Sequence, residues 1–312
     1  MNRLLRAMAL MLALSLPAAC NAKAAPAPTP EAPASGVLTP SASGIKIVFH
    51  PDYLLVYSFD WAAEAGRIQA ILHELQGFYE FVKPEPASQE DMRAVHTQSL
   101  IGRTFLDPGE VLATGAAGGT SPFTGELYKI APLAAGGAIL AAELAVQGQV
   151  TFGLIRPPGH HASADYSYGE CYLNNIAIAV TKLLNEKKIE RALIVDFDVH
   201  PGDGTEAIFR DDGRVTYYGI LPGDRIQQLK GMEDFLKEKT DYDILAVSAG
   251  FDGAEAEGGG GVLETEDFTT IGKLLKEAAE RNSGGRRFAV LEGGYNQEVL
   301  GKNVKAFLEG FE

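Results

Sequence analysis

Short apolar runs separated by longer helical patterns are the feature that most constrains the fold of this 312-residue chain. Six such runs lie at residues 45–49, 150–155, 192–197, 215–218, 244–247 and 288–291. Runs that are apolar on both faces and alternate with helices are typical of a parallel sheet covered by helices on both sides. The sequence therefore predicts one α/β domain built on a central, mainly parallel sheet.

The segments between these runs carry the helical patterns. Helices are expected over residues 62–76, 126–147, 173–186, 206–210, 227–238, 265–281 and 297–309. Ser88, with Asp91 three residues later, has the pattern of a helix N-cap before Met92. No internal repeat interrupts this alternation, so we expect a single domain over residues 44–312.

The first 43 residues have a different composition. Two arginines precede an apolar run over residues 7–16 and small residues before Cys20, which is the pattern of a secretory signal peptide. We expect a signal peptide over residues 1–19 and an Ala/Pro-rich tether over residues 20–43. Residues 16–20 resemble a lipobox, in which Cys20 carries a lipid, and cleavage without lipidation is the alternative. Both predict export by a bacterium, to the periplasm or as an outer-membrane lipoprotein with membrane attachment.

The charge balance restricts the partners. With 41 acidic and 27 basic residues, the chain has a formal net charge of -14. Such a chain lacks the basic surface with which proteins grip phosphate backbones. We therefore expect no nucleic-acid partner and a preference for cationic ligands.

Polar residues gather directly after four of the apolar runs. In parallel sheets, ligands bind beyond the carboxyl ends of the strands. Residues at these four ends include three of the six histidines and several carboxylates: His160, His161, Asp196, Asp198, His200 and Asp203. This concentration predicts a metal centre or an acid–base centre. His50, His73 and His96 have no such company and are interpreted as structural.

Asp198 and His200 have the spacing of two ligands to one cation. At positions i and i+2 of an extended segment, their side chains point to the same face. A catalytic zinc site needs three protein ligands and an open position. The third ligand must come from another strand end, where Asp252, Glu255 and Glu257 are available.

His160 and His161 each need an acceptor on the second ring nitrogen, and Asp196 and Asp203 are available for this role. Two such dyads beside a metal can take a proton from water and return it to a leaving amine. Asp203 could instead cap the following helix. The Tyr295 hydroxyl, on a loop with two preceding glycines, could donate to an oxyanion, or Tyr295 could lie in a surface turn.

Five segments together resemble the histone deacetylase family, which includes bacterial acetylpolyamine amidohydrolases. They are Arg156-Pro-Pro-Gly-His-His-Ala162, Cys171-Tyr-Leu-Asn-Asn175, Asp196-Phe-Asp-Val-His-Pro-Gly-Asp-Gly204, Ser248-Ala-Gly-Phe-Asp252 and Glu292-Gly-Gly-Tyr-Asn296. The resemblance spans about residues 45–312. It implies an arginase-like α/β fold with one Zn²⁺ at the bottom of a narrow tunnel, and a K⁺ ion near residues 196–200.

The resemblance also assigns roles to single residues. Asp198 and His200 match zinc ligands, His160 with Asp196 and His161 with Asp203 match the two dyads, and Tyr295 matches the tyrosine that polarises the acetyl carbonyl. Arg67 resembles the basic residue that lines the inner cavity of the family. His161 is expected to be the main base, with His160 acting electrostatically. The expected third ligand is Glu257, at a position where the family has aspartate, and Glu255 is the alternative.

Two further departures concern the substrate. Glu170, after Gly169, stands where the family usually has a phenylalanine in the tunnel wall, and its carboxylate would attract a cationic chain. The alternative is that Glu170 turns outward to solvent. The stretch between Tyr218 and Asp243 is short, which predicts a more open tunnel. We therefore expect a small cationic acetylated amine, such as an acetylpolyamine, or an acetyl-lysine compound as the substrate.

Two other functions fit parts of the pattern. The first is a catalytically weak protein that binds or senses acetylated amines on the same fold, because Glu257 would weaken the metal site. The second is a manganese ureohydrolase, which is disfavoured because Asp252 lacks an Asp-x-Asp partner. The sequence makes no prediction of the oligomeric state.

Overall fold

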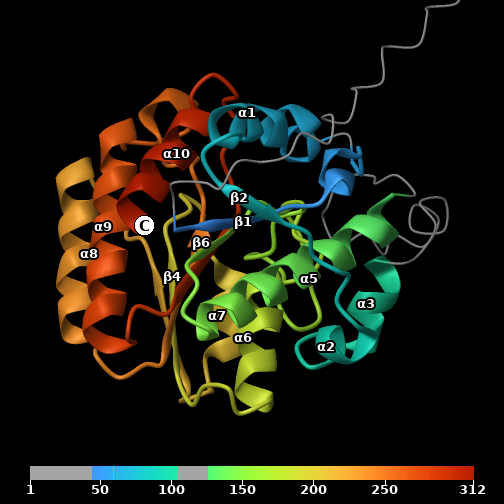
Figure 1. Ribbon diagram of the computed structural model, residues 1–312. Helices are drawn as coiled ribbons and strands as arrows, with labels where there is room; N and C mark the ends of the chain where they lie inside the picture. Colours follow the sequence, from blue (N-terminus) through green and yellow to red (C-terminus); the bar gives the residue numbers. More distant parts are fainter. Residues whose placement is uncertain (1–43, 59, 105–125) are drawn as a thin grey trace, which may run out of the picture. The chain divides into compact units, whose positions relative to one another are not determined.

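A computed structural model describes residues 44–58, 60–104 and 126–312 (Figure 1). The expected signal peptide (1–19) and the tether that begins at Cys20 (20–43) lie outside these residues. The strands are β1 Lys46–Val48, β2 Glu80–Val82, β3 Thr151–Gly153, β4 Ala192–Asp196, β5 Val215–Gly219, β6 Ile244–Ala249 and β7 Arg287–Leu291. The α-helices are α1 Ala65–Leu75, α2 Gln89–Arg93, α3 Gln98–Thr104, α5 Leu127–Val146, α6 Asn175–Asn185, α7 Asp203–Phe209, α8 Arg225–Glu238, α9 Thr265–Asn282 and α10 Leu300–Phe311. The 3₁₀ helices are η1 Pro51–Leu54, η2 Trp61–Ala63 and η3 Glu255–Glu257.

The described strands form one parallel sheet in the order β2-β1-β3-β7-β6-β4-β5. Each of the six apolar runs of the sequence is a strand of this sheet, which confirms the predicted α/β class. Parallel neighbours need crossover connections, and the helices between the strands supply them. The seventh strand, β2, was not predicted because it is a three-residue edge strand with an exposed Glu80.

The core lies on both faces of the sheet. In β4, Ile194 packs in the cluster that contains α5 and α6, whereas Leu193 packs in the cluster that contains α9 and α10. Figure 1 shows α5 and α6 on one side of the sheet and α9 and α10 on the other. Burial on both faces explains why the strands read as continuous apolar runs.

Helix α5 is the most apolar of the described helices that cover the sheet. By length and composition alone it could cross a membrane, but 72% of its apolar window is buried inside the domain. Its contacts with β1, β3 and β7 are those of a core helix. We therefore interpret α5 as part of the core.

The sheet order brings the four polar segments together. They follow β3, β7, β6 and β4, which are consecutive neighbours in the sheet. Asp196 of β4 pairs with Ser248 of β6, so the ends of these two strands are level. The chemistry-bearing residues therefore meet at one edge of the sheet, as predicted.

Capping explains several helix starts. The predicted cap Ser88 accepts from the Asp91 N–H at 3.1 Å, and the Asp91 carboxylate accepts from the Ser88 N–H in return, before α2. Asn174 Oδ1 accepts from the Ala177 N–H at 3.0 Å and so begins α6 where the loop from the polar edge ends. Such a cap contributes about 1 kcal/mol. The first residue of α7 is Asp203, earlier than the expected 206.

Candidate active site

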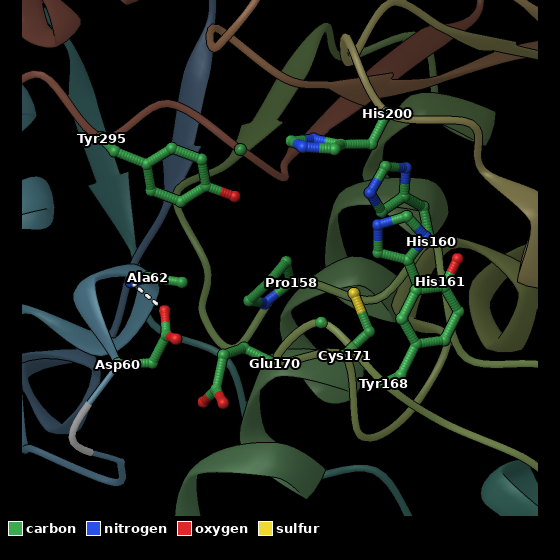
Figure 2. A pocket seen from close by; sticks show the side chains of 12 residues that line it. Asp60, Ala62, Pro158, His160, His161, Tyr168, Glu170, Cys171, His200 and Tyr295 are labelled. Atoms are coloured by element: carbon green, nitrogen blue, oxygen red, sulfur yellow. Dashed lines mark hydrogen bonds between the residues drawn. The ribbon is translucent and has the colours of Figure 1, made fainter. Parts of the chain in front are cut away.

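A cavity of about 270 Å³ opens at the polar edge of the sheet. Several predicted site residues line it: His160, His161, Gly169, Glu170, His200 and Tyr295. Figure 2 shows the three imidazoles on one side of the cavity and the Tyr295 hydroxyl pointing into it. Residues from segments far apart in the sequence therefore share one cavity.

Both expected histidine–aspartate pairs are present. His160 Nδ1 lies 3.1 Å from Asp196 Oδ2, and His161 Nδ1 lies 2.8 Å from Asp203 Oδ1. The two ring centroids lie 4.2 Å apart, and the ring planes are tilted by 40°. Because each Nδ1 faces a carboxylate, Nε2 is the ring nitrogen that remains for proton transfer.

The two dyads have opposite electrostatics. Burial lowers the pKa of His160, but Asp198 and Asp196 outweigh this effect, so the pKa lies well above its ordinary value. Burial and the nearby His160 lower the pKa of His161, against the opposing effect of Asp203. The pKa values of the two neighbouring rings are therefore shifted in opposite directions, upward for His160 and downward for His161.

Three donor atoms form a candidate metal group at the base of the cavity. Asp198, His200 and Asp252 each offer one such atom, and these atoms all lie within 4.8 Å of one another. His200 Nδ1 lies 3.0 Å from Asp198 Oδ1 and 2.9 Å from Asp252 Oδ2. Both carboxylates raise the pKa of His200 to about 10. The proton on the His200 ring places a positive charge between the carboxylates, where a bound cation would otherwise place it.

This group has the form of a ligand set. A single ring N–H cannot serve two carboxylates at once, and the buried Asp252 Oδ2 has no hydrogen bond of acceptable geometry within the described residues. Burial and the charge of Asp198 raise the pKa of Asp252 to about 6. Two oxygens and one nitrogen that converge in this way fit a divalent cation of the zinc type.

Glycine backbone closes around the carboxylates. The Gly293 N–H donates to Asp198 Oδ2 at 2.8 Å. A Cβ at Gly293 would collide with both Asp252 and Asp198, and a Cβ at Gly250 would collide with Asp198. The absence of side chains at these two positions lets β6, β7 and the segment after β4 approach closely.

The expected third ligand, Glu257, does not belong to this group. Its Oε1 accepts from the N–H groups of Tyr295 and Asn296, both at 2.8 Å. Glu255 is exposed, so the alternative ligand is not there either. Asp252 lies near His200 because Ser248 pairs with Asp196, and Asp252 and His200 each follow these paired residues by four positions.

Arg67 also occupies a different place from the one expected. Its side chain is 1% exposed and does not line the cavity. Its guanidinium donates to the carbonyls of Glu292 at 2.7 Å and Gly294 at 2.5 Å, and its Cζ lies 4.9 Å from the centre of the Tyr295 ring. Arg67 therefore supports the loop that carries Tyr295. Burial raises the pKa of Tyr295, so the phenol stays protonated and can donate.

Glu170 faces the cavity and does not turn outward to solvent. It is 3% exposed, with φ of 59°, and it accepts from the Tyr172 hydroxyl at 3.0 Å. A non-glycine residue at such a φ is strained, and strain of this kind concentrates at functional sites. Asp60, which we did not predict, also lines the cavity, and Figure 2 shows the Glu170 carboxylate turned away from the imidazoles.

Tyr168 is a further cavity residue that the sequence did not reveal. Its ring stacks on His161 at 4.4 Å, and its hydroxyl donates to Asp203 Oδ1 at 2.8 Å. Burial raises the pKa of Asp203, but hydrogen bonds from His161 and Tyr168 outweigh this and lower it. The only sequence signal was its position directly before Gly169.

Comparison with protein families matches residues 62–222 and 228–311 to the histone deacetylase domain. The chain belongs to the histone deacetylase family. It is 32% identical to a probable deacetylase of Methanothermobacter thermautotrophicus, over 85% of this chain and 90% of that protein. The match confirms the family and the arginase/deacetylase-like fold expected from the sequence.

Two further relatives of the histone deacetylase family are named by activity. A histone deacetylase-like amidohydrolase of Pseudomonas aeruginosa is 30% identical over 69% of this chain and 66% of that protein. The polyamine deacetylase HDAC10 of Mus musculus is 32% identical over 70% of this chain but only 39% of its own length. Relatives that are named deacetylases and amidohydrolases support a hydrolase.

Proposed function

We propose that this chain is a zinc-dependent amidohydrolase that removes an acetyl group from an N-acetylated amine of the polyamine or lysine type. One observation carries the proposal: the Asp198–His200–Asp252 group lies beside both histidine–aspartate dyads, and one cavity joins them to Tyr295. Metal-assisted amide hydrolysis needs a cation, a base, an acid and an oxyanion donor. Residues of this chain could hold the cation, serve as the base and the acid, and donate to the oxyanion.

Asp198, His200 and Asp252 would hold the zinc. When bound, zinc supplies Lewis-acid polarisation of the acetyl carbonyl and makes water more acidic. Mixed carboxylate and imidazole ligands suit zinc, and three protein ligands leave a position open for chemistry. Asp252 Oδ2 lies 2.9 Å from His200 Nδ1 without a hydrogen bond of acceptable geometry, which is consistent with such a ligand set.

The protein residues then move the protons. Neutral His161 accepts a proton at Nε2 from the attacking water, because its Nδ1 is held by Asp203. The Tyr295 hydroxyl donates to the developing oxyanion. Transfer of the proton from His161 Nε2 to the leaving nitrogen completes cleavage of the C–N bond, which yields acetate and the free amine. His160, fixed by Asp196, contributes positive charge beside the developing negative charge.

Acidic residues at the cavity support a cationic substrate. Glu170 and Asp60 both line it, and the whole chain carries a net charge of -14. A second ammonium group of a polyamine would be attracted to these carboxylates. The resemblance to a protein named polyamine deacetylase points in the same direction.

The alternative of a weak binding protein loses its main argument. It depended on Glu257 as a poor third ligand, and the Asp198–His200–Asp252 group supports a ligand set that does not need Glu257. Both dyads and the phenol are also arranged as hydrolysis requires.

The proposal is tested by metal content and acetate release. Protein reconstituted with Zn²⁺ should bind about one ion per chain and release acetate from an N-acetylated diamine and from an acetyl-lysine reporter. Asp252→Ala should lose both the metal and the activity, whereas Glu257→Gln should keep the metal. No acetate release by the zinc-loaded parent would refute the proposed activity. Metal loss in Glu257→Gln combined with retention in Asp252→Ala would refute the ligand set.

A further inference from the structure

The loop Glu292–Asn296 must hold Tyr295 in a fixed position although it has no regular secondary structure. It leaves β7 at Leu291 and passes through Gly294, whose φ is 113°. At that turn the N–H groups of Tyr295 and Asn296 point to one acceptor. Successive N–H groups in such a turn form a concavity that binds an anion.

Glu257 fills this concavity. Its Oε1 accepts from both N–H groups at 2.8 Å, which makes two charge-assisted hydrogen bonds. A neighbouring hydrogen bond, which Asn296 Nδ2 donates to the Ala256 carbonyl at 2.8 Å, reinforces this contact. Helix η3, which carries Glu257 and Ala256, is thus fastened to the Tyr295 loop at both its side chain and its backbone.

Arg67 holds the same loop through its carbonyls. It donates to the carbonyls of Glu292 and Gly294, and its guanidinium lies over the Tyr295 ring. Tyr295 is therefore held through its amide by an anion and through the neighbouring carbonyls by a cation. Neither Glu257 nor Arg67 lines the cavity, so both act through Tyr295.

We propose that Glu257 is the positioning residue of Tyr295, which sets the place of the phenol in the cavity without touching metal or substrate. This inference rests on the proposed function, in which Tyr295 donates to the oxyanion. A donor helps only where charge develops, and a displacement of about 1 Å can cost about 10²-fold in rate. Loss of Glu257 should therefore affect turnover more than ground-state binding.

The first test is kinetic. Glu257→Ala should lower kcat by about tenfold to a hundredfold, with KM changed by less than about twofold and zinc content unchanged. Glu257→Gln, which keeps an oxygen acceptor, should recover part of the loss. Glu255→Gln is the matched control, because it removes the same charge from an exposed position of the same helix and should leave kcat within about twofold. Loss of zinc in Glu257→Ala would overturn the proposal.

The second test is a double-mutant cycle with Tyr295→Phe. If Glu257 acts through the phenol, Glu257→Ala should cost less than about twofold in the Tyr295→Phe background. An equal loss in both backgrounds would show that Glu257 supports the fold generally, and the proposal would fail. Should Glu257→Ala not fold, Glu257→Gln completes the same cycle.

The third test does not depend on activity. Amide hydrogen exchange at Tyr295 and Asn296 should be faster in Glu257→Ala and unchanged in Glu255→Gln. Unchanged exchange in Glu257→Ala would show that Glu257 does not hold the Tyr295 loop. If the zinc-loaded parent hydrolyses no acetylated amine, the proposed function fails, while this measurement still decides whether Glu257 holds the loop.

Discussion

His96 connects Ser163 and Asn174, which lie in the segment between His161 and α6. It can do so only as a neutral ring. It is 3% exposed, its Nδ1 lies 2.9 Å from the Ser163 carbonyl, and its Nε2 accepts from the Asn174 N–H at 2.9 Å. Protonation would place an N–H against the Asn174 N–H, and burial already disfavours the charged form. Burial lowers the pKa of His96 from 6.5 to about 4.

This shift makes stability depend on pH. The folded state binds the proton less readily than the unfolded state, so the contribution of His96 is fully present above pH 6.5 and is lost as the pH falls toward about 4. Between about pH 7.5 and about pH 5, the two pKa values give a loss of about 2 kcal/mol in the free energy of unfolding. The direction is opposite for a histidine whose folded pKa is raised.

The measurement is urea denaturation of the parent and of His96→Gln at both pH values, at equal metal content. The variant should be less stable at neutral pH by about 1–3 kcal/mol, because the Ser163 carbonyl loses its donor. The difference in the free energy of unfolding between parent and variant should shrink by about 2 kcal/mol at the lower pH, since only the parent carries the titrating ring. Every other group titrates in both proteins and cancels. The same pH dependence in parent and variant would refute the reasoning.

Three further predictions concern the cavity. Tyr295→Phe should lower kcat by about 10² or more with little change in KM, and an unchanged kcat would remove the phenol from the mechanism. Glu170→Phe should lower kcat/KM for an N-acetylated polyamine by about tenfold at low salt and spare a neutral acetyl-lysine reporter. Equal losses on both substrates would mean that Glu170 supports the wall only. Removal of the metal by a chelator should lower the Tm, because a cation that binds only the folded state stabilises it, and an unchanged Tm would speak against a bound cation.

The sheet could be predicted because burial on both faces leaves a direct mark on the sequence. Six strands read as apolar runs, and helices such as α9 read as amphipathic patterns of the right length. β2 and α3 were missed because they are short and contain no long continuous buried apolar run. The start of α7 was placed too late because Asp203 serves both as its first residue and as the partner of His161.

The residues alone offered Asp196 and Asp203 as acceptors for the two histidines, and only the family resemblance assigned each aspartate to its histidine. The third ligand could not be found by counting along the chain, because register decides which residues are level. Ser248 pairs with Asp196, and Asp252 lies beside His200, whereas Glu257 is the last residue of η3. The contacts of Arg67 with residues more than two hundred positions away leave no local signal at all.

The two glycines packed against Asp198 and the loop residues that line the cavity should differ in their tolerance to substitution. At Gly250 and Gly293 any side chain would collide with Asp198, so directed evolution that varies these positions should recover only glycine among active clones. Asp60, Tyr168 and Glu170 line the cavity with side chains from loops. Libraries aimed at new acetylated amines therefore belong at Asp60 and Glu170, because Tyr168 contacts both His161 and Asp203 and its replacement would disturb that dyad.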